Sequence, residues 1–142
     1  MLLLSQQLCF ALYSTTHAFN RAYKPLLAPL DLTYPQYLVM LVLWEGDNLT
    51  VKEIGAKLQL DSGTLTPLLK RLEAAKMVAR ERDTVDERQV RIKLTEGGRA
   101  LRKKAETIPR KLTAAIGRPI PDIVALRQQL TQLRERMDAI TD

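Results

Sequence analysis

The stretch Asp61-Ser-Gly-Thr-Leu-Thr-Pro-Leu-Leu-Lys-Arg-Leu-Glu73 decides the fold of this 142-residue chain. On a helical wheel four leucines cluster on one side: Leu65, Leu68, Leu69 and Leu72. Small, hydroxylated and basic residues occupy the other side: Gly63, Thr66, Pro67, Lys70, Arg71 and Ala74. Such a helix buries its leucines and presents a narrow basic face that fits the major groove of DNA. Because proline bends a helix interior, we expect Pro67 in the amino-terminal half of this helix.

The residues before this stretch predict a second helix at its side. Thr50 and Glu53 form the pattern of a capping box and open a short helix through Lys57. The next helix begins near Asp61 or Ser62, so three or four residues join the two. This spacing predicts a helix-turn-helix.

Another capping box, Thr33 with Gln36 and with Pro35 in the first turn, opens an earlier helix. It carries the apolar run Tyr37 to Trp44. A helix that is apolar almost all round must lie in the core.

The residues after the stretch predict a β-hairpin. Val90, Ile92 and Leu94 alternate with Arg91 and Lys93, which is the period of a half-buried strand. Residues 78–82 can pair with it, and the tip at residues 83–87 precedes Arg88. A basic hairpin after a helix-turn-helix is a wing, which would bring an arginine to a minor groove. Thr95 then caps a helix from Glu96 to about Thr107.

The net charge of +6 comes from the same region. Residues 70–104 hold 12 Lys and Arg against six Asp and Glu, while the other residues hold ten of each kind. A charge run is commonly a solvated surface. Here it coincides with the helix-turn-helix and the wing, which favours binding to nucleic acid.

Both ends of the chain predict helices with apolar stripes. The first begins at about Ser5 and carries Leu4, Leu8, Leu12, Phe19 and Tyr23. The last has apolar residues spaced alternately three and four apart, at Ile123, Leu126, Leu130, Leu133, Met137 and Ile140. This seam either packs on its own chain or joins two chains, and with the first helix it favours a homodimer. A twofold dimer would bind a pseudo-palindromic DNA site with half-sites about one helical turn apart.

Composition excludes several classes of protein. One cysteine and one histidine cannot form an internal disulfide or a zinc site of four Cys or two Cys and two His. We expect no cofactor and no metal. The longest apolar run has eight residues, against the ~20 of a membrane helix. No Lys or Arg precedes Arg21, so an export signal is not expected, and a free thiol fits the cytoplasm.

The segments Asp61–Glu73 and Asp86–Glu96 resemble the recognition helix and wing of the MarR family of winged-helix repressors, with a match from about Leu4 to Arg110. Gln7–Tyr13 and Leu32–Met40 resemble its organic-hydroperoxide-sensing branch, the OhrR repressors. The resemblance implies a mainly α-helical fold with a small β-hairpin. Residues 33–95 would form the winged helix-turn-helix lobe, and residues 1–32 and 96–142 a helical dimerisation lobe.

The resemblance also assigns roles to single residues. Cys9 would be the redox sensor, Tyr23 and Tyr34 of the other subunit would hydrogen-bond its sulfur, and Tyr13 would be a third tyrosine nearby. Arg88 would enter the minor groove, oriented by Asp86. The residues at or near DNA would be Ser62, Thr64, Thr66, Lys70 and Arg71.

The chemistry of Cys9 agrees with such a role. A thiolate attacks peroxides, and Cys9 is expected in about the second turn of its helix, near the positive end of the dipole. Some OhrR proteins carry a resolving cysteine after the wing, but Arg110–Ile116 has none. Oxidised Cys9 would therefore pass through a sulfenic acid to a mixed disulfide with a low-molecular-weight thiol, or to over-oxidised forms.

The expected protein is a repressor, not an enzyme, that leaves its operator on oxidation by organic hydroperoxides and so releases a peroxide-detoxifying gene. Three other hypotheses stay open. A small phenolic or lipophilic ligand could release the DNA, with Cys9 incidental. The protein could be a thiol peroxidase, which would share the reactive thiolate but would not need a wing. It could also be a purely structural dimer, but such a dimer would not need its net positive charge confined to the helix-turn-helix and the wing.

Overall fold

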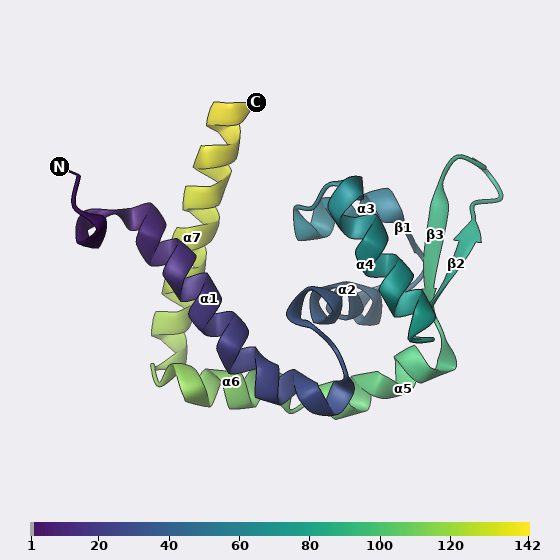
Figure 1. Ribbon diagram of the computed structural model, residues 1–142, viewed down its shortest axis with the longest axis horizontal. Coiled ribbons are helices and arrows are strands. Elements are labelled where there is room, and N and C mark those ends of the chain that lie inside the picture. The colour runs from purple at the N-terminus through teal and green to yellow at the C-terminus, as the bar shows by residue number, and fades with distance from the viewer. Residues whose placement is uncertain (1) are drawn as a thin grey trace. The chain divides into compact units, whose positions relative to one another are not determined.

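In the computed structural model, which describes residues 2–142, two short helices follow one another at the predicted positions (Figure 1). They are α3, Val51–Leu58, and α4, Ser62–Ala74. The Thr50 hydroxyl accepts a hydrogen bond from the Glu53 amide at 3.1 Å, and the Glu53 carboxylate accepts one from the Thr50 amide at 2.9 Å. Asp61 caps α4 by accepting the Thr64 amide at 2.7 Å. The helix-turn-helix is therefore confirmed.

The core forms around α2, Tyr34–Glu45, whose capping box joins Thr33 to Gln36 as predicted. Val39 and Met40 are completely buried. The four leucines of α4 are also buried, so the predicted apolar face of that helix is confirmed. Pro67 lies in its amino-terminal half, as expected.

The sheet has three antiparallel strands in the order β1-β3-β2. The hairpin strands β2, Val78–Arg82, and β3, Val90–Leu94, have the predicted bounds. β1, Leu49–Thr50, pairs with β3 through Leu49 opposite Ile92. The sequence does not reveal β1, because two residues are too few to show a period.

The start of α5, Glu96–Ala105, joins the hairpin to the helices. The Thr95 hydroxyl accepts the Gly98 amide at 3.0 Å and donates to the Lys76 carbonyl at 2.7 Å. The Trp44 indole N–H donates to the Gly98 carbonyl at 2.9 Å. A Cβ on Gly98 would overlap the Met77 carbonyl oxygen, so only glycine permits this approach.

The amino-terminal region corrects the expectation of a helix from about Ser5. A single 3-10 turn, η1, covers Leu4–Gln6, and Gln7 is extended at φ −90° and ψ 116°. Helix α1 begins only at Leu8, runs through Pro25 to Leu27, and is followed by the 3-10 turn η2, Ala28–Leu30. Cys9 therefore lies in the first turn of α1, not the second.

The chain divides into two compact units after Glu106, and the second unit has two helices. These are α6, Ile108–Ile116, and α7, Ile120–Thr141. Gly117 ends α6 in the left-handed region at φ 68°. Three residues of the predicted seam on α7, Leu126, Leu130 and Met137, are between 41% and 49% exposed in the single chain.

Two features of residues 2–142 bear on other classes of protein. No single helix there has both the length and the apolar character needed to cross a bilayer, although the helices of residues 8–30 and 34–45, bent by 65°, pass that test as a pair. No three His, Cys, Asp or Glu side chains in the same range gather as a metal ion would require.

Gly98→Ala should destabilise the fold, because the added methyl meets backbone that cannot move without breaking the Thr95 cap. We expect a loss of about 1–3 kcal/mol in the free energy of unfolding, measured by urea denaturation. Gly97→Ala is the matched control, since its Cβ would have its nearest neighbour at an ordinary 3.6 Å. That variant should gain up to ~1 kcal/mol from helix propensity. Equal stability of the two variants would contradict this account of the junction.

Candidate nucleic-acid interface and candidate redox site

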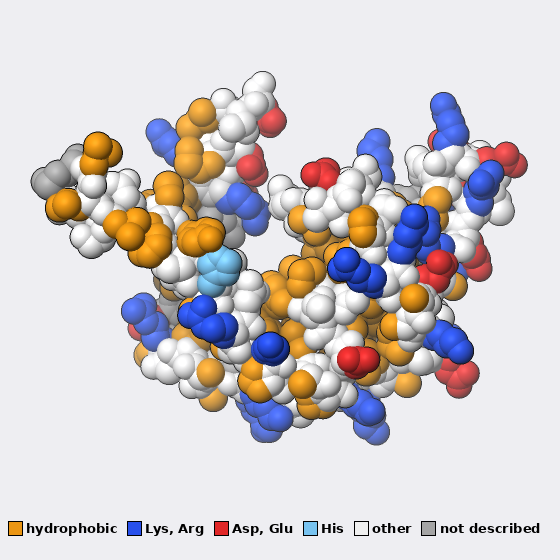
Figure 2. Space-filling model, in the orientation of Figure 1, with side chains coloured by type: hydrophobic (Ala, Val, Ile, Leu, Met, Phe, Trp, Pro, Cys, Tyr) orange, Lys and Arg blue, Asp and Glu red, His pale blue; other side chains and the backbone are white. Residues whose placement is uncertain are grey.

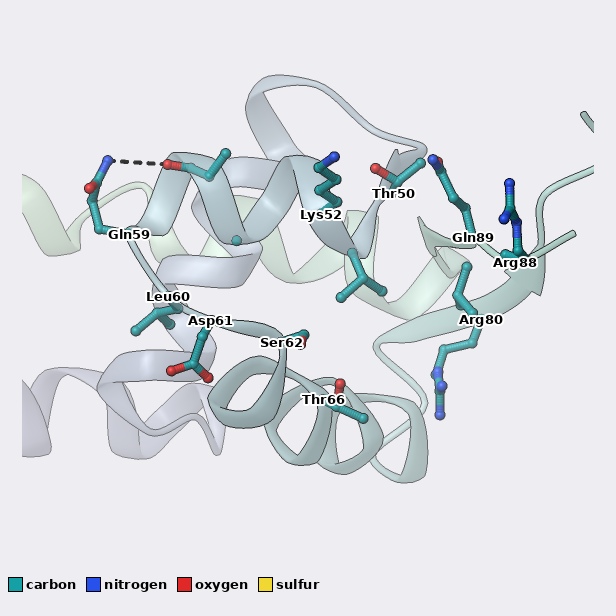
Figure 3. A pocket seen from close by; sticks show the side chains of 14 residues that line it. Thr50, Lys52, Gln59, Leu60, Asp61, Ser62, Thr66, Arg80, Arg88 and Gln89 are labelled. Atoms are coloured by element: carbon teal, nitrogen blue, oxygen red, sulfur yellow. Dashed lines mark hydrogen bonds between the residues drawn. The ribbon is translucent and has the colours of Figure 1, made fainter. Parts of the chain in front are cut away.

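A groove of about 950 Å³ opens between α3, the start of α4 and the hairpin (Figure 3). Three of the predicted DNA-binding residues line it: Ser62, Thr66 and Arg88. The others do not line the groove, but Thr64, Lys70 and Arg71 are exposed on α4. Figure 2 shows Lys and Arg side chains over the hairpin and the helix-turn-helix, with Asp and Glu side chains among them. The arrangement offers a narrow polar helix face beside a cationic hairpin, which suits duplex DNA.

The tip of the wing holds Arg88 as the sequence predicts. One oxygen of the Asp86 carboxylate accepts the Arg88 amide at 3.1 Å and its Nε at 3.3 Å. The Arg88 side chain is 92% exposed, so Asp86 orients a guanidinium that projects into solvent. Asp86 is thus the carboxylate that contacts Arg88, and the role of the pair toward DNA stays a prediction.

A second set of contacts ties the wing to the sheet. Arg91 donates from Nε to Asp83 at 3.3 Å and from Nη1 to the Asn48 carbonyl at 2.9 Å. The Asp83 amide donates to the Gln89 carbonyl at 2.9 Å. Hydrogen bonds from the Val85 amide and from Arg91 lower the pKa of Asp83. This carboxylate stays charged and anchors the base of the wing tip.

Sequence reasoning did not identify three other polar residues of the groove, Lys52, Arg80 and Gln89. Only Arg80 could have been found from the sequence. Side chains alternate between the two faces of a strand, so Arg80 lies on the same face of β2 as the apolar Val78. Nothing in the sequence distinguishes Lys52 and Gln89 from the other polar residues of the chain. Only the packing of α3 against α4 and the hairpin places them in the groove.

Cys9 is exposed on the first turn of α1. Tyr13 lies one turn further along, also exposed, with its ring edge-on to His17 at 4.5 Å between centroids. Apolar side chains surround this end of the helix, including Leu8, Phe10 and Leu12, all partly exposed. Figure 2 shows this hydrophobic cluster over the amino-terminal part of α1.

The other tyrosines gather where the end of α1 meets α2. The rings of Tyr23 and Tyr34 lie 4.6 Å apart, and Tyr37 lies 5.8 Å from Tyr23. Burial, then the neighbouring phenols, raise the pKa of Tyr23 from 10.0 to about 12. Burial also raises the pKa of Tyr34 and Tyr37. Tyr23 and Tyr34 therefore remain protonated hydrogen-bond donors at neutral pH.

One chain does not bring Cys9 to these tyrosines. Cys9 and Tyr23 lie on the same continuous helix, fourteen positions apart, which is about 21 Å at the α-helical rise. Tyr34 packs against Tyr23 and is therefore at the far end as well. The predicted cluster of cysteine and tyrosines can form only if a second chain supplies one side of it.

Residues 21–105 match the family model described as transcriptional regulator SarA/Rot. The chain belongs to this family. Its members are MarR-like winged-helix proteins, so the resemblance on which the sequence analysis drew is confirmed. This SarA/Rot chain is therefore a DNA-binding transcriptional regulator.

Two curated relatives are similar over almost the whole chain. The HTH-type transcriptional regulator TtmR of Methylorubrum extorquens is 54% identical over 96% of this chain and 70% of its own length. The organic hydroperoxide resistance transcriptional regulator of Bacillus subtilis is 46% identical over 94% of this chain and 91% of its own.

The fold of this SarA/Rot regulator is also similar to that of AbfR from Staphylococcus epidermidis. Reduced AbfR bound to DNA has a TM-score of 0.86 at 33% identity, covering 98% of this chain and 95% of that one. Overoxidized AbfR bound to DNA has a TM-score of 0.77 at 36% identity, covering 94% and 93%.

The raised pKa of Tyr23 predicts a loss of stability in alkali. The folded state holds the phenolic proton of Tyr23 more tightly than the unfolded state does. The contribution of this proton to the free energy of unfolding is therefore complete below pH 10 and disappears as pH rises to about 12. The free energy of unfolding from urea titrations should fall over that range, and less steeply in Tyr23→Phe. Tyr13→Phe, which removes an exposed phenol from the same helix, is the control. A Tyr23→Phe variant that loses stability as steeply as its parent would contradict the prediction.

Proposed function

We propose that this SarA/Rot regulator is a homodimeric repressor that senses organic hydroperoxides through Cys9 and releases operator DNA when that cysteine is oxidised. Residues 33–95 form the DNA-binding lobe, and residues 1–32 and 96–142 form the dimerisation lobe. Its place is the cytoplasm, where it controls a gene for peroxide detoxification.

The position of Cys9 is the observation that carries the redox assignment. The thiol is free and exposed within the first turn of α1, so a peroxide can reach its sulfur from solvent. In a dimer, Tyr23 and Tyr34 of the second chain donate their phenolic hydrogens to the sulfur. The similarity to the Bacillus subtilis organic hydroperoxide resistance regulator supports this assignment.

The proposed reaction oxidises the sulfur by two electrons. The Cys9 thiolate attacks the peroxide, the O–O bond breaks and an S–O bond forms. The alkoxide takes a proton and leaves as an alcohol, and the resulting sulfenate is protonated to the sulfenic acid. The sequence holds no second cysteine, so a low-molecular-weight thiol then displaces water and leaves a mixed disulfide. Excess peroxide oxidises the sulfenic acid further.

The coupling to DNA runs through the dimer interface. A complete switch between bound and released forms needs roughly 5 kcal/mol of differential free energy. A polar adduct on Cys9 disrupts both the apolar packing around Leu8 and Leu12 and the hydrogen bonds from the tyrosines. The spacing of the two winged lobes then no longer matches half-sites one helical turn apart.

The dimer is supported by the apolar side chains that the single chain leaves exposed. On α1 they include Leu8, Phe10 and Phe19, and on α7 they follow the seam of residues 123–140. Helices with such stripes bury them against a partner.

A second candidate function has its own observation. A cavity of about 680 Å³ between α1, α2 and α3 has mainly apolar walls, with Lys24 and Tyr34 among its polar residues. A small phenolic or lipophilic molecule fits such a cavity. Under this hypothesis the ligand releases the DNA, and Cys9 is incidental.

Cys9→Ser should bind DNA like the parent and lose the response to peroxide, because a hydroxyl cannot take part in this oxidation. The probe is the duplex beside the gene for this chain, followed by fluorescence anisotropy. One equivalent of cumene hydroperoxide, with and without a small thiol, should release only the parent. Tyr13→Phe and Tyr23→Phe test the contribution of each phenol to the rate of release.

Equal retention of DNA by the parent and by Cys9→Ser after peroxide would refute the redox assignment and leave the small-molecule hypothesis. Repeated consumption of peroxide without loss of DNA would instead indicate an enzyme. A need for the small thiol would indicate that the mixed disulfide is the released form.

Leu130→Glu should weaken the dimer, because it introduces carboxylates into the seam of α7. Burial of an unpaired charge costs about 3 kcal/mol or more, so the dimer dissociation constant should rise by at least about 100-fold. Analytical ultracentrifugation measures it. Gln129→Glu, which makes a similar change at an exposed position outside the seam, is the control. Unchanged dimerisation in Leu130→Glu would count against the seam as the interface.

A further inference from the structure

Arg80 breaks the pattern of the strand in which it lies. In the hairpin Val78 is opposite Leu94, and Arg80 is opposite Ile92. Val78, Ile92 and Leu94 are all buried, so this face of the hairpin is its core face. A cation on a face of this kind is unusual, and positions that violate the local pattern are commonly functional.

Among residues 2–142 the Arg80 side chain has no hydrogen-bond or ion-pair partner. Its Nε is shielded from water and finds no acceptor among the residues that the structure describes. No carboxylate in residues 2–142 forms an ion pair with it. The three other arginine and lysine residues of β2 and β3 differ from Arg80: Arg91 and Lys93 pair with Asp83 and Glu81, and Arg82 is exposed. A buried donor without an acceptor is costly, so an acceptor from outside the chain is expected.

The groove in Figure 3 shows where that acceptor would lie. Arg80 extends from β2 beside Thr66 of α4, with Arg88 on the hairpin and Lys52 on α3. The groove lining contains a single carboxylate, Asp61, and one of its oxygens already accepts the Thr64 amide. Three cations against one carboxylate give the groove a net positive charge, which favours an anion.

We propose that Arg80 is a further DNA-binding residue, which holds a backbone phosphate between the recognition helix and the wing. If α4 enters a major groove and Arg88 the adjacent minor groove, the sugar-phosphate strand that separates those grooves passes over the gap between α4 and the hairpin. Arg80 lies in that gap. A guanidinium can donate two N–H groups to one phosphate, and such a contact fixes the register of the protein without reading sequence. This inference rests on the proposed operator binding.

The test is the salt dependence of DNA binding by Arg80→Gln in the full-length protein. The logarithm of the binding constant falls with the logarithm of salt concentration by about 0.9 for each phosphate neutralised. Loss of one contact per subunit should therefore reduce the slope of the dimer by about 1.8. The affinities for the operator fragment and for a duplex of random sequence should fall by the same factor, because a phosphate contact is independent of sequence.

Two variants separate a phosphate contact from a structural role. Arg80→Lys keeps the charge and should keep most of the slope, whereas a role in packing alone would leave the slope of Arg80→Gln unchanged. Lys93→Gln makes the same change of charge on the opposite face of the hairpin and should keep the parental slope. Urea titrations establish that each variant is folded. If Arg80→Gln proves unfolded, Arg80→Met, which keeps the apolar stem, replaces it in the same measurement.

The outcomes distinguish this inference from the proposed function. If the parent binds neither duplex, operator binding itself fails. If the parent binds and a folded Arg80→Gln or Arg80→Met keeps the parental slope, Arg80 does not contact phosphate and only the present inference is overturned. A loss of affinity confined to the operator fragment would also overturn it, since that would indicate a base contact.

Discussion

Burial of the leucine face of α4 is the constraint on which the DNA-binding side of the molecule depends. Each fully buried leucine contributes about 1.5–3 kcal/mol, so α4 cannot rotate about its axis without a large loss. Because the four leucines face the core, the hydroxylated and basic residues of the same helix must face outward. The caps at Thr50 and Asp61 then determine where each helix of the pair begins.

The contacts at Thr95 and Gly98 fix the position of the hairpin relative to the helices. Trp44 from α2 and the Thr95 hydroxyl both contact the backbone at Gly98. Arg91 binds both Asp83 in the hairpin and the Asn48 carbonyl beside β1. The wing is therefore tied to the core at its base, while Arg88 at its tip remains free to reach a ligand. Rigid support beneath an exposed side chain is what recognition of a duplex requires.

The length of α1 imposes a different constraint on sensing. A helix that carries Cys9 in its first turn and Tyr23 in its last turns keeps them far apart within one chain. In the proposed homodimer a sensor composed of both residues would be shared between two chains, so a change at the sulfur would act directly on the dimer interface. In this arrangement, oxidation of one cysteine would change the spacing of the two DNA-binding lobes without any additional mobile segment.

Local pattern in the sequence alone determined where α2, α3, α4 and α5 begin, the hairpin and the buried face of α4. Capping boxes at Thr33 and Thr50 and the alternation of residues 90–94 each depend on side chains only a few positions apart, which is why they could be read without a structure. The strand β1, the groove around Arg80 and the packing of Tyr23 on Tyr34 were decided only by the tertiary structure. These features join segments far apart in the chain, and no local period records such contacts. The extended Gln7, which places Cys9 in the first turn of α1, also escaped the sequence, because an apolar stripe marks a helix face but not the residue where the helix begins.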